Sequence, residues 1–337
     1  MRIRVIGHTP DQDFFTATSK PWSMFFRALK QKHEIVTSKI GVSKFDCLVV
    51  NSHSPKALKL ALKLGIPKSK ILMIYWEPSV SYPKLHTKKI RNQYGKVYTP
   101  SKHWSNELEG TYFNWPQVLI KDKYVNFKNW QERKNKTVMI LANKFSAKRD
   151  QNYSLRRKIW KIKDGDGNFI VDLFGAYWNK GFYFDFSHFF KMLTRTRLSD
   201  WDFYSWIYLG KKQKNYLGTS SNKKVTAEDY RINLVIENCA EYVSEKLFEA
   251  HLSQNIVIYV GANLAKEGIN PGIAIEVSPK INAIKDAIRQ IQSLHPKEQY
   301  KLMKKQQAIA RRESKKRFNE KVLANLAKTI SKDLSQE

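Results

Sequence analysis

A short stretch of the chain carries polar side chains whose types suit the binding of an anion. They are Glu237, Asn238, Tyr242, Glu245 and Lys246. Ser244 is a favourable N-cap for a helix that begins at Glu245, so unpaired backbone NH groups and the positive end of the helix dipole would face the preceding loop. Lys246 adds a full positive charge at the same place. We therefore expect an anion site suited to a pyrophosphate.

The carboxylates in this stretch indicate a second kind of contact. A phosphate has no use for a carboxylate, but Glu237 or Glu245 can accept two hydrogen bonds from the vicinal hydroxyls of a ribose or another sugar. An anion site beside such a carboxylate describes the binding of a nucleotide-sugar. The alternative is an ordinary helix start that carries solvated charges.

The apolar residues around the stretch predict the elements that position it. Residues 232–236 and 256–260 are short apolar runs of β-forming type, which are typical of buried strands. Between them Leu247, Phe248 and Leu252 recur at helical spacing. Strand, loop, helix and strand in this order form the crossover of a parallel sheet. The polar loop would then lie at the carboxyl end of a strand, where open α/β sheets bind ligands.

Strands and helices alternate over most of the chain. Further strand candidates are 2–7, 46–50, 71–76, 95–98, 137–142 and 169–174, and helix candidates are 22–32, 55–64, 151–163 and 281–294. This order predicts an α/β protein with parallel sheets covered on both faces. The apolar pattern is lost at 121–136, where we place an interdomain linker. We expect an N-terminal acceptor-binding domain at 1–130, a C-terminal nucleotide-sugar-binding domain at 131–295 and a basic helical tail at 296–337.

The run IENCAEYVSEKLFEAHLSQNIVIYVGA at 236–262 resembles the C-terminal signature of the α-1,3/4-fucosyltransferase family, glycosyltransferase family 10. That signature reads roughly F-E-N-S, a short gap, Y-V-T-E-K, a helix, and P-V/I-Y-G. Here Ser244 stands in place of Thr, and Cys239 in place of the frequent Ser. The resemblance implies inverting transfer of fucose from GDP-fucose to a hydroxyl of an N-acetylglucosamine-containing glycan, with α-1,3 or α-1,4 linkage. The two tandem domains are similar to the GT-B architecture, in which two Rossmann-like domains face a cleft.

A basic residue in the segment NKFSAKR, 143–149, is a second candidate for the phosphates. The segment follows a predicted strand and precedes a helix. The family has a motif like S-N-x-x-x-x-R at this place, and its Arg contacts the donor phosphates. The resemblance implies this role for Arg149, with Lys148 as the second choice. The alternative is one more arginine in a basic protein.

An inverting transfer also needs a base within hydrogen-bond reach of the acceptor hydroxyl. Glu77 is the best candidate, because it ends the predicted strand 71–76 and is flanked by Trp76 and Pro78. Partial desolvation by Trp76 would raise its pKa. The segment WEPSVSYP is similar to the family's E-S-P segment, with Pro78 and Ser79 in exchanged order.

Three histidines, His8, His53 and His103, are rival bases, and the first two also follow predicted strands. No pair of the D-x-D type and no His/Cys cluster has the spacing of a metal site, since 164–166 reads as a turn beside Gly167. Lys246, Arg149 and the helix end can do the work of a divalent cation. We therefore expect neither a metal nor a cofactor.

The charge of the chain leaves a rival function open. The 337 residues include 60 Lys and Arg against 30 Asp and Glu, a formal net charge of +30, which predicts a nucleic acid, an acidic lipid or a phosphorylated substrate as partner. Residues 177–222 are dense in aromatic residues and lysines and could stack on bases, or form an insertion packed on their own domain. A basic nucleic-acid-binding protein is thus the alternative, as is a GT-B transferase of another nucleotide-sugar. The fucosyltransferase interpretation expects no nucleic acid.

The composition also bears on location. Two cysteines allow no disulfide framework, which favours a reducing compartment, and no run approaches the ~20 apolar residues of a spanning helix. We expect a cytoplasmic protein. The tail from Lys301 is basic and amphipathic, with a stripe of Leu323, Leu326 and Ile330. It can lie on an anionic membrane at its inner face or pack back on the N-terminal domain, and both alternatives stay open.

Overall fold

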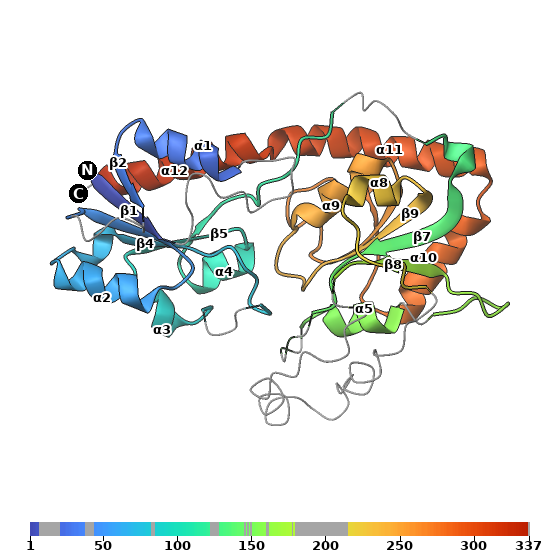
Figure 1. Ribbon diagram of the computed structural model, residues 1–337, viewed down its shortest axis with the longest axis horizontal. Helices are drawn as coiled ribbons and strands as arrows, with labels where there is room; N and C mark the ends of the chain where they lie inside the picture. Colours follow the sequence, from blue (N-terminus) through green and yellow to red (C-terminus); the bar gives the residue numbers. More distant parts are fainter. Residues whose placement is uncertain are drawn as a thin grey trace. The chain divides into compact units, whose positions relative to one another are not determined.

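The computed structural model describes residues 1–6, 21–37, 44–81, 85–121, 128–144, 146, 148, 150–159, 162–176, 178 and 215–335. The chain forms two compact units (Figure 1). Unit 1 consists of Met1–Leu119 and Lys316–Glu337, and unit 2 of Ile120–Lys315. Each unit contains one sheet.

The sheet of unit 1 has the strand order β2-β1-β3-β4-β5-β6, and every pairing is parallel. The strands are β1 (Arg2–Ile6), β2 (Glu34–Thr37), β3 (Cys47–Asn51), β4 (Ile71–Ile74), β5 (Lys96–Thr99) and β6 (Thr111–Tyr112). All four residues of β4 are buried, because a central parallel strand is covered on both faces. The sequence predicted β1, β3, β4 and β5 but not the short strands β2 and β6.

Helices cover both faces of this sheet. On one face lie α1 (Pro21–Lys30) and α12 (Asn319–Ser335), and on the other α2 (Pro55–Lys63), α3 (Lys88–Arg91) and α4 (Lys102–Glu107). Leu323, Leu326 and Ile330 of α12 are buried in one core with Phe25 and Phe26 of α1. Of the two alternatives for the tail, α12 therefore packs back on the N-terminal unit, and its apolar stripe is not free to meet a lipid.

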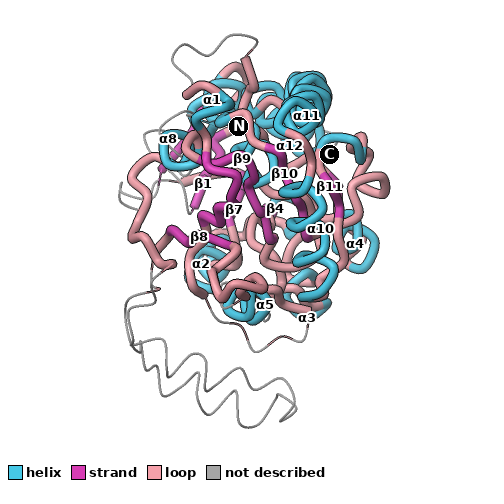
Figure 2. The backbone as a smooth tube through the Cα atoms, turned by 90° about the vertical axis from the view of Figure 1, so that its right-hand side faces the viewer, coloured by secondary structure: helices cyan, strands magenta, loops and turns pink. Residues whose placement is uncertain are grey.

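The sheet of unit 2 has the strand order β11-β10-β9-β7-β8, again with parallel pairings. Figure 2 labels these strands, drawn in magenta. The strands are β7 (Lys134–Ile140), β8 (Val171–Phe174), β9 (Tyr230–Ile236), β10 (Ile256–Val260) and β11 (Ile275–Glu276). Every residue of β9, the central strand, is buried. The two parallel α/β sheets confirm the predicted fold class.

Helices of unit 2 lie on both faces of its sheet. Figure 1 shows α8 (Lys223–Ala227) and α9 (Glu245–Ala250) on one side, and α5 (Tyr153–Ile159) and α10 (Ile281–Ser293) on the other. Helix α11 (Pro296–Lys316) contacts β10 through Gln306. The backbone N of Val257 donates to Gln306 Oε1, and Gln306 Nε2 donates to the carbonyl O of Val257. Turns of 3-10 helix are η1 (Lys68–Lys70), η2 (Trp130–Glu132), η5 (His251–Ser253) and η6 (Pro271–Ile273).

The predicted crossover is confirmed in its details. Strand β9, helix α9 and strand β10 follow one another, with Ile256 beside Ile232 in parallel register.

Most of the aromatic stretch, residues 177 and 179–214, lies outside the described residues. Within the described part of the chain, none of the helices has the length and apolar character needed to cross a bilayer.

His251 lies directly after α9 and is fully buried. Burial lowers the pKa of His251 to about 4, whereas an unfolded histidine titrates near 6.5. The unfolded chain therefore binds more protons between these two values, so stability should fall as the pH drops from about 6.5 to about 4. Across this window we expect His251 alone to remove about 3 kcal/mol.

The measurement is the free energy of unfolding in urea at intervals over this pH range. His251→Gln cannot take up the proton, so its stability curve should be flatter than that of the wild type. Equal slopes for the two proteins would show that His251 does not titrate in this way.

Candidate functional site

A buried carboxylate at the start of the loop between β9 and α9 accepts hydrogen bonds from residues at its end. Glu237 follows the last residue of β9 and is 2% exposed. Its Oε1 accepts a hydrogen bond from the backbone N of Ser244 at 2.9 Å, and Ser244 Oγ lies 2.7 Å from Oε2. Lys246 Nζ donates to Oε2 at 3.3 Å. These contacts occupy both oxygens of Glu237, so of the two predicted sugar-binding carboxylates Glu237 has a structural role.

Ser244 caps α9 as predicted. Its backbone is extended, with φ −83° and ψ −178°, and its Oγ accepts from the backbone N of Lys246 at 3.4 Å. The same hydroxyl lies 2.8 Å from Lys246 Nζ, which donates to it. Ser244 thus joins the helix start, the lysine and Glu237 into one hydrogen-bonded group.

Two charged side chains of this loop keep partial exposure. The side chains of Glu245 and Lys246 are 23% and 18% exposed, and Lys246 Nζ lies 3.6 Å from Glu245 Oε1. Burial opposes the charge of Lys246, but Glu237 and Glu245 outweigh it and raise its pKa above the ordinary value. Burial likewise opposes the charge of Glu245, whereas Lys246 and Lys223 lower its pKa. Both groups are therefore ionised at neutral pH, and both can meet a ligand.

The remaining predicted residues of the loop are more enclosed. Tyr242 is buried, 8% exposed. Asn238 is half-buried, and its Oδ1 accepts a hydrogen bond from Arg156 Nη2 at 2.9 Å. Arg149 lies outside the described residues, whereas Lys148 is half-buried. The structure therefore brings Asn238, Glu245 and Lys246 together on one loop and leaves Arg149 unplaced.

Arg156 of α5 also contacts this loop, and it was not predicted from the sequence. Arg156 is 2% exposed, and its guanidinium donates to the carbonyl O of Ile236 at 2.5 Å and to Asn238 Oδ1. The ring of Tyr153 lies 5.0 Å from it. Burial lowers the pKa of Arg156 to about 10, although Tyr153 and Glu237 oppose the shift. The signal in the sequence was an arginine on the buried side of a helix, three residues after Tyr153 and three before Ile159.

Arg156 should be needed for stability because two hydrogen-bond acceptors depend on it. Arg156→Met keeps much of the side-chain volume but leaves Ile236 O and Asn238 Oδ1 without this donor. An unsatisfied buried acceptor costs about 1–3 kcal/mol, so we expect a loss of about 2–5 kcal/mol in the free energy of unfolding. Urea denaturation measures it. The exposed Lys158→Met on the same helix is the matched control, and equal losses in both variants would contradict this role.

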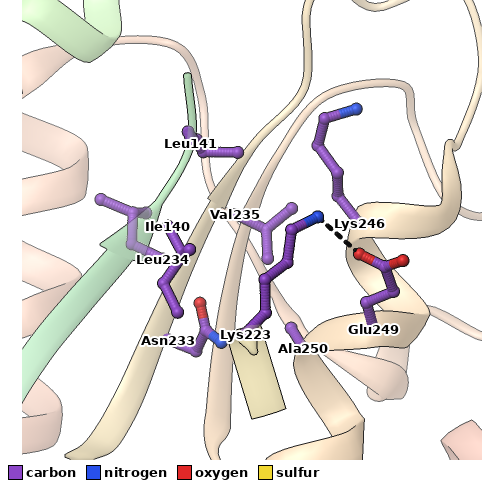
Figure 3. A pocket seen from close by; sticks show the side chains of 9 residues that line it. All are labelled: Ile140, Leu141, Lys223, Asn233, Leu234, Val235, Lys246, Glu249 and Ala250. Atoms are coloured by element: carbon purple, nitrogen blue, oxygen red, sulfur yellow. Dashed lines mark hydrogen bonds and ion pairs between the residues drawn. The ribbon is translucent and has the colours of Figure 1, made fainter. Parts of the chain in front are cut away.

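A small cavity lies beside α9, against β7 and β9 (Figure 3). Its volume is about 30 Å³, and it is lined by Ile140, Leu141, Lys223, Asn233, Leu234, Val235, Lys246, Glu249 and Ala250. Lys223 Nζ reaches Glu249 Oε2 at 2.8 Å, while Lys246 extends away from this pair (Figure 3). The volume corresponds to about one water molecule. The cavity is therefore too small to hold a nucleotide, since sites for drug-sized ligands have volumes of about 300–1,000 Å³.

Gly175, at the end of β8, has a structural explanation. Its φ is +138°, and a Cβ at this position would lie 2.2 Å from the carbonyl O of Leu141. The glycine is needed for the close approach of the ends of β8 and β7.

The predicted base belongs to unit 1. Glu77 follows Trp76 beyond the end of β4, and its side chain is exposed. Trp76 is buried instead in the core of unit 1, with its ring 5.1 Å from Phe113 and 5.5 Å from Trp115. The desolvation of Glu77 by Trp76 that we expected is therefore wrong, because the indole packs into the core.

The rival bases differ in their surroundings. His8 lies outside the described residues. His53 Nδ1 lies 2.8 Å from Tyr94 Oη, and burial lowers the pKa of His53. His103 is exposed on α4 with its ring 4.9 Å from that of Trp104. Among the residues that the structure describes, no three His, Cys, Asp or Glu side chains are grouped closely enough to hold a metal ion.

Comparison with known proteins gives matches in structure alone. Neither the protein-family models nor the curated proteins match the chain. A structure of an alpha1,3-fucosyltransferase covers 100% of this chain and 90% of its own, with 13% identity and a TM-score of 0.56. An alpha1,3-fucosyltransferase with GDP covers 90% of this chain and 80% of its own, with 14% identity and a TM-score of 0.50. An alpha-glucosyltransferase in complex with UDP and a 13-mer DNA covers 98% of both chains, with 9% identity and a TM-score of 0.54.

These likenesses show the fold. The chain has two Rossmann-like units with parallel sheets, and this is the architecture of GT-B glycosyltransferases. The polar loop lies beyond the carboxyl end of the central strand β9, which is where open α/β sheets bind their ligands.

Proposed function

We propose that the protein is an inverting glycosyltransferase that transfers fucose from GDP-fucose to a hydroxyl of an N-acetylglucosamine-containing glycan, with α-1,3 or α-1,4 linkage. The observation that carries the proposal is the ionised pair of Glu245 and Lys246 at the start of α9. A cation and a carboxylate side by side suit a ligand that presents both phosphate and vicinal hydroxyls. The likeness of the sequence at 236–262 to the fucosyltransferase signature supports fucose as the sugar.

Lys246 would bind the diphosphate of the donor. In the structure Lys246 Nζ forms ion pairs with both Glu237 and Glu245, and the raised pKa of Lys246 keeps it protonated. An ammonium group has three donors, so Lys246 can add a phosphate oxygen while it keeps a bond to Glu237. Glu245 can then accept from hydroxyls of the ribose or the fucose. Arg149 would supply a second cation, and Asn238 and Tyr242 would complete the donor site.

Glu77 would act as the base on the acceptor. It takes the proton of the acceptor hydroxyl while that oxygen forms a bond to C1 of fucose from the face opposite the diphosphate. The bond from C1 to the diphosphate oxygen breaks at the same time, and GDP leaves with its electron pair. Lys246 and Arg149 stabilise the charge that develops on GDP. With these cations we propose a reaction that uses no divalent metal.

We also place the enzyme in the cytoplasm, attached peripherally to an anionic membrane surface. Helix α11 exposes a row of lysines that supports this proposal, namely Lys297, Lys301, Lys304 and Lys305. Such residues contribute about 1 kcal/mol each near an anionic leaflet. Sedimentation with vesicles that contain phosphatidylserine tests it, and binding that does not fall with added salt would contradict it.

The nucleotide specificity tests the proposal most directly. Thermal unfolding should be followed with GDP, UDP, CMP and a DNA and an RNA oligonucleotide, since a ligand that binds the folded state raises the midpoint. We expect the largest shift with GDP. A larger shift with UDP would overturn the choice of fucose but keep a transferase, and a shift with oligonucleotides alone would overturn both.

A second candidate is a GT-B transferase that uses another nucleotide-sugar and a polyanionic acceptor. It is favoured by the formal net charge of +30 and by the fold shared with a glucosyltransferase whose structure contains UDP and DNA. This candidate predicts nucleic-acid binding that weakens steeply with salt but still requires Glu245 and Lys246. A nucleic-acid-binding protein without transferase activity would not require them.

A further inference from the structure

Unit 1 contains a larger cavity far along the chain from the donor loop. Its volume is about 190 Å³, and it lies between residues 111–114, at and after β6, and residues 316–329, from the end of α11 into α12. It is lined by Thr111, Tyr112, Phe113, Asn114, Lys316, Lys321, Val322, Asn325, Leu326 and Thr329. Drug-sized ligands occupy cavities of about 300–1,000 Å³. This cavity therefore suits a smaller molecule, of the size of one sugar ring.

Three of the side chains that line the cavity are apolar and buried. Phe113, Val322 and Leu326 are buried members of the core of unit 1, and the same three side chains line the cavity. An apolar floor offers the CH groups of a sugar ring a surface to contact. The half-buried ring of Tyr112 adds an aromatic wall.

Polar side chains, several of them from α12, also line the cavity. Lys321, Asn325 and Thr329 stand four residues apart, so they form one stripe along the helix. Asn114 and Thr111 contribute from the side of β6. Amide and hydroxyl groups both donate and accept hydrogen bonds, which matches the hydroxyls of a sugar.

The charged side chains that line the cavity are all positive. Lys316 and Lys321 are its only ionisable groups apart from the phenol of Tyr112, and none of the ten residues is acidic. Both lysines are exposed, so their ammonium groups can turn toward a ligand at the rim. Lys102 Nζ lies 5.7 Å from the centre of the Tyr112 ring and adds a third positive charge next to the cavity.

We propose that this cavity binds a sugar ring that carries one acidic substituent. The ring lies on Phe113 and Leu326, its hydroxyls bond to Asn325 and Asn114, and its acidic group meets Lys316 and Lys321. A phosphate or a carboxylate on the sugar would satisfy the same two lysines. The site lies wholly in unit 1 and does not depend on the donor nucleotide, whose proposed residues Glu245 and Lys246 belong to unit 2.

The test uses the full-length protein and four probes, namely glucose 6-phosphate, glucuronate, glucose and inorganic phosphate. Binding is measured by calorimetry and by the protection of Tyr112 and Lys321 from chemical modification. We expect saturable binding of at least one acidic sugar, with glucose and phosphate each weaker by about tenfold or more, because each lacks one set of contacts. Which acidic sugar binds tighter identifies the phosphate or the carboxylate as the preferred group.

Variants locate the site. Lys316→Ala with Lys321→Ala should weaken the acidic sugar by about tenfold or more, and Asn325→Leu should weaken it while leaving inorganic phosphate unaffected. Lys328→Ala, also exposed on α12 but outside the cavity, is the control. These positions are at the surface, so unfolding midpoints close to the wild type should accompany the losses. The proposal would be overturned if glucose, or inorganic phosphate, bound as tightly as the acidic sugars. It would also be overturned if the variants bound the acidic sugar as tightly as the wild type does.

Discussion

Replacing Glu77 with glutamine should lower the turnover of GDP-fucose with a glycan acceptor by about 10²–10⁴-fold, the usual contribution of a general base. The amide keeps the size of the side chain but cannot accept the proton of the acceptor hydroxyl. Glu77 is exposed in unit 1, so the substitution should not disturb the core. The affinity for GDP, measured by calorimetry, should stay at the wild-type value because the proposed donor residues lie in unit 2.

The matched control is Glu107→Gln, which removes another exposed carboxylate from unit 1, on α4. It should retain full activity. If Glu77→Gln is as active as this control, the base is one of the histidines, and His53→Gln becomes the next variant. A parallel fall of turnover and GDP affinity in Glu77→Gln would instead indicate that Glu77 acts on the donor.

Lys246→Met should weaken the binding of GDP by about tenfold to a hundredfold, because a hydrogen bond to a charged group contributes about 1.5–3 kcal/mol. The variant removes the cation that lies between Glu237 and Glu245. It also leaves the buried carboxylate of Glu237 without its counterion, which can cost about 3–5 kcal/mol of stability. Loss of GDP binding and loss of folding must therefore be separated.

Two further variants separate them. Glu237→Gln with Lys246→Met removes both charges and should restore much of the stability, but not the affinity for GDP. Lys280→Ala, an exposed lysine of unit 2 at the start of α10, is the control for a nonspecific effect of charge. If the folded double variant binds GDP as tightly as Lys280→Ala does, the diphosphate is not bound at Lys246, and the donor site must be sought elsewhere.

The segment from β9 to β10 could be predicted because its signals are local. The apolar runs of the two strands and the hydroxyl of Ser244 before Glu245 depend on residues within a few positions of one another, and the structure confirms both. Strands β6 and β11 were missed because each has only two residues. Such short strands exist only because a neighbouring strand pairs with them, and they leave no periodic pattern in the sequence.

The roles of individual charged residues were harder to predict from the sequence. The sequence offered both Glu237 and Glu245 as sugar-binding carboxylates, and only the folded loop shows that Glu237 is buried against Ser244 and Lys246. Trp76 was expected to cover Glu77 but lies in the core of unit 1. In both cases the direction of a side chain decided the outcome, and that direction is set by what packs around it.

The sequence by itself determined that the chain builds parallel α/β sheets and that a capped helix start with Glu245 and Lys246 follows a buried strand, since these features arise from neighbouring residues. Only the tertiary structure decided that Arg156 holds the end of β9, 80 residues along the chain at Ile236, and that α12 returns to complete the core of unit 1. Contacts between distant segments form where buried surfaces fit in three dimensions, and no pattern along the chain encodes that fit.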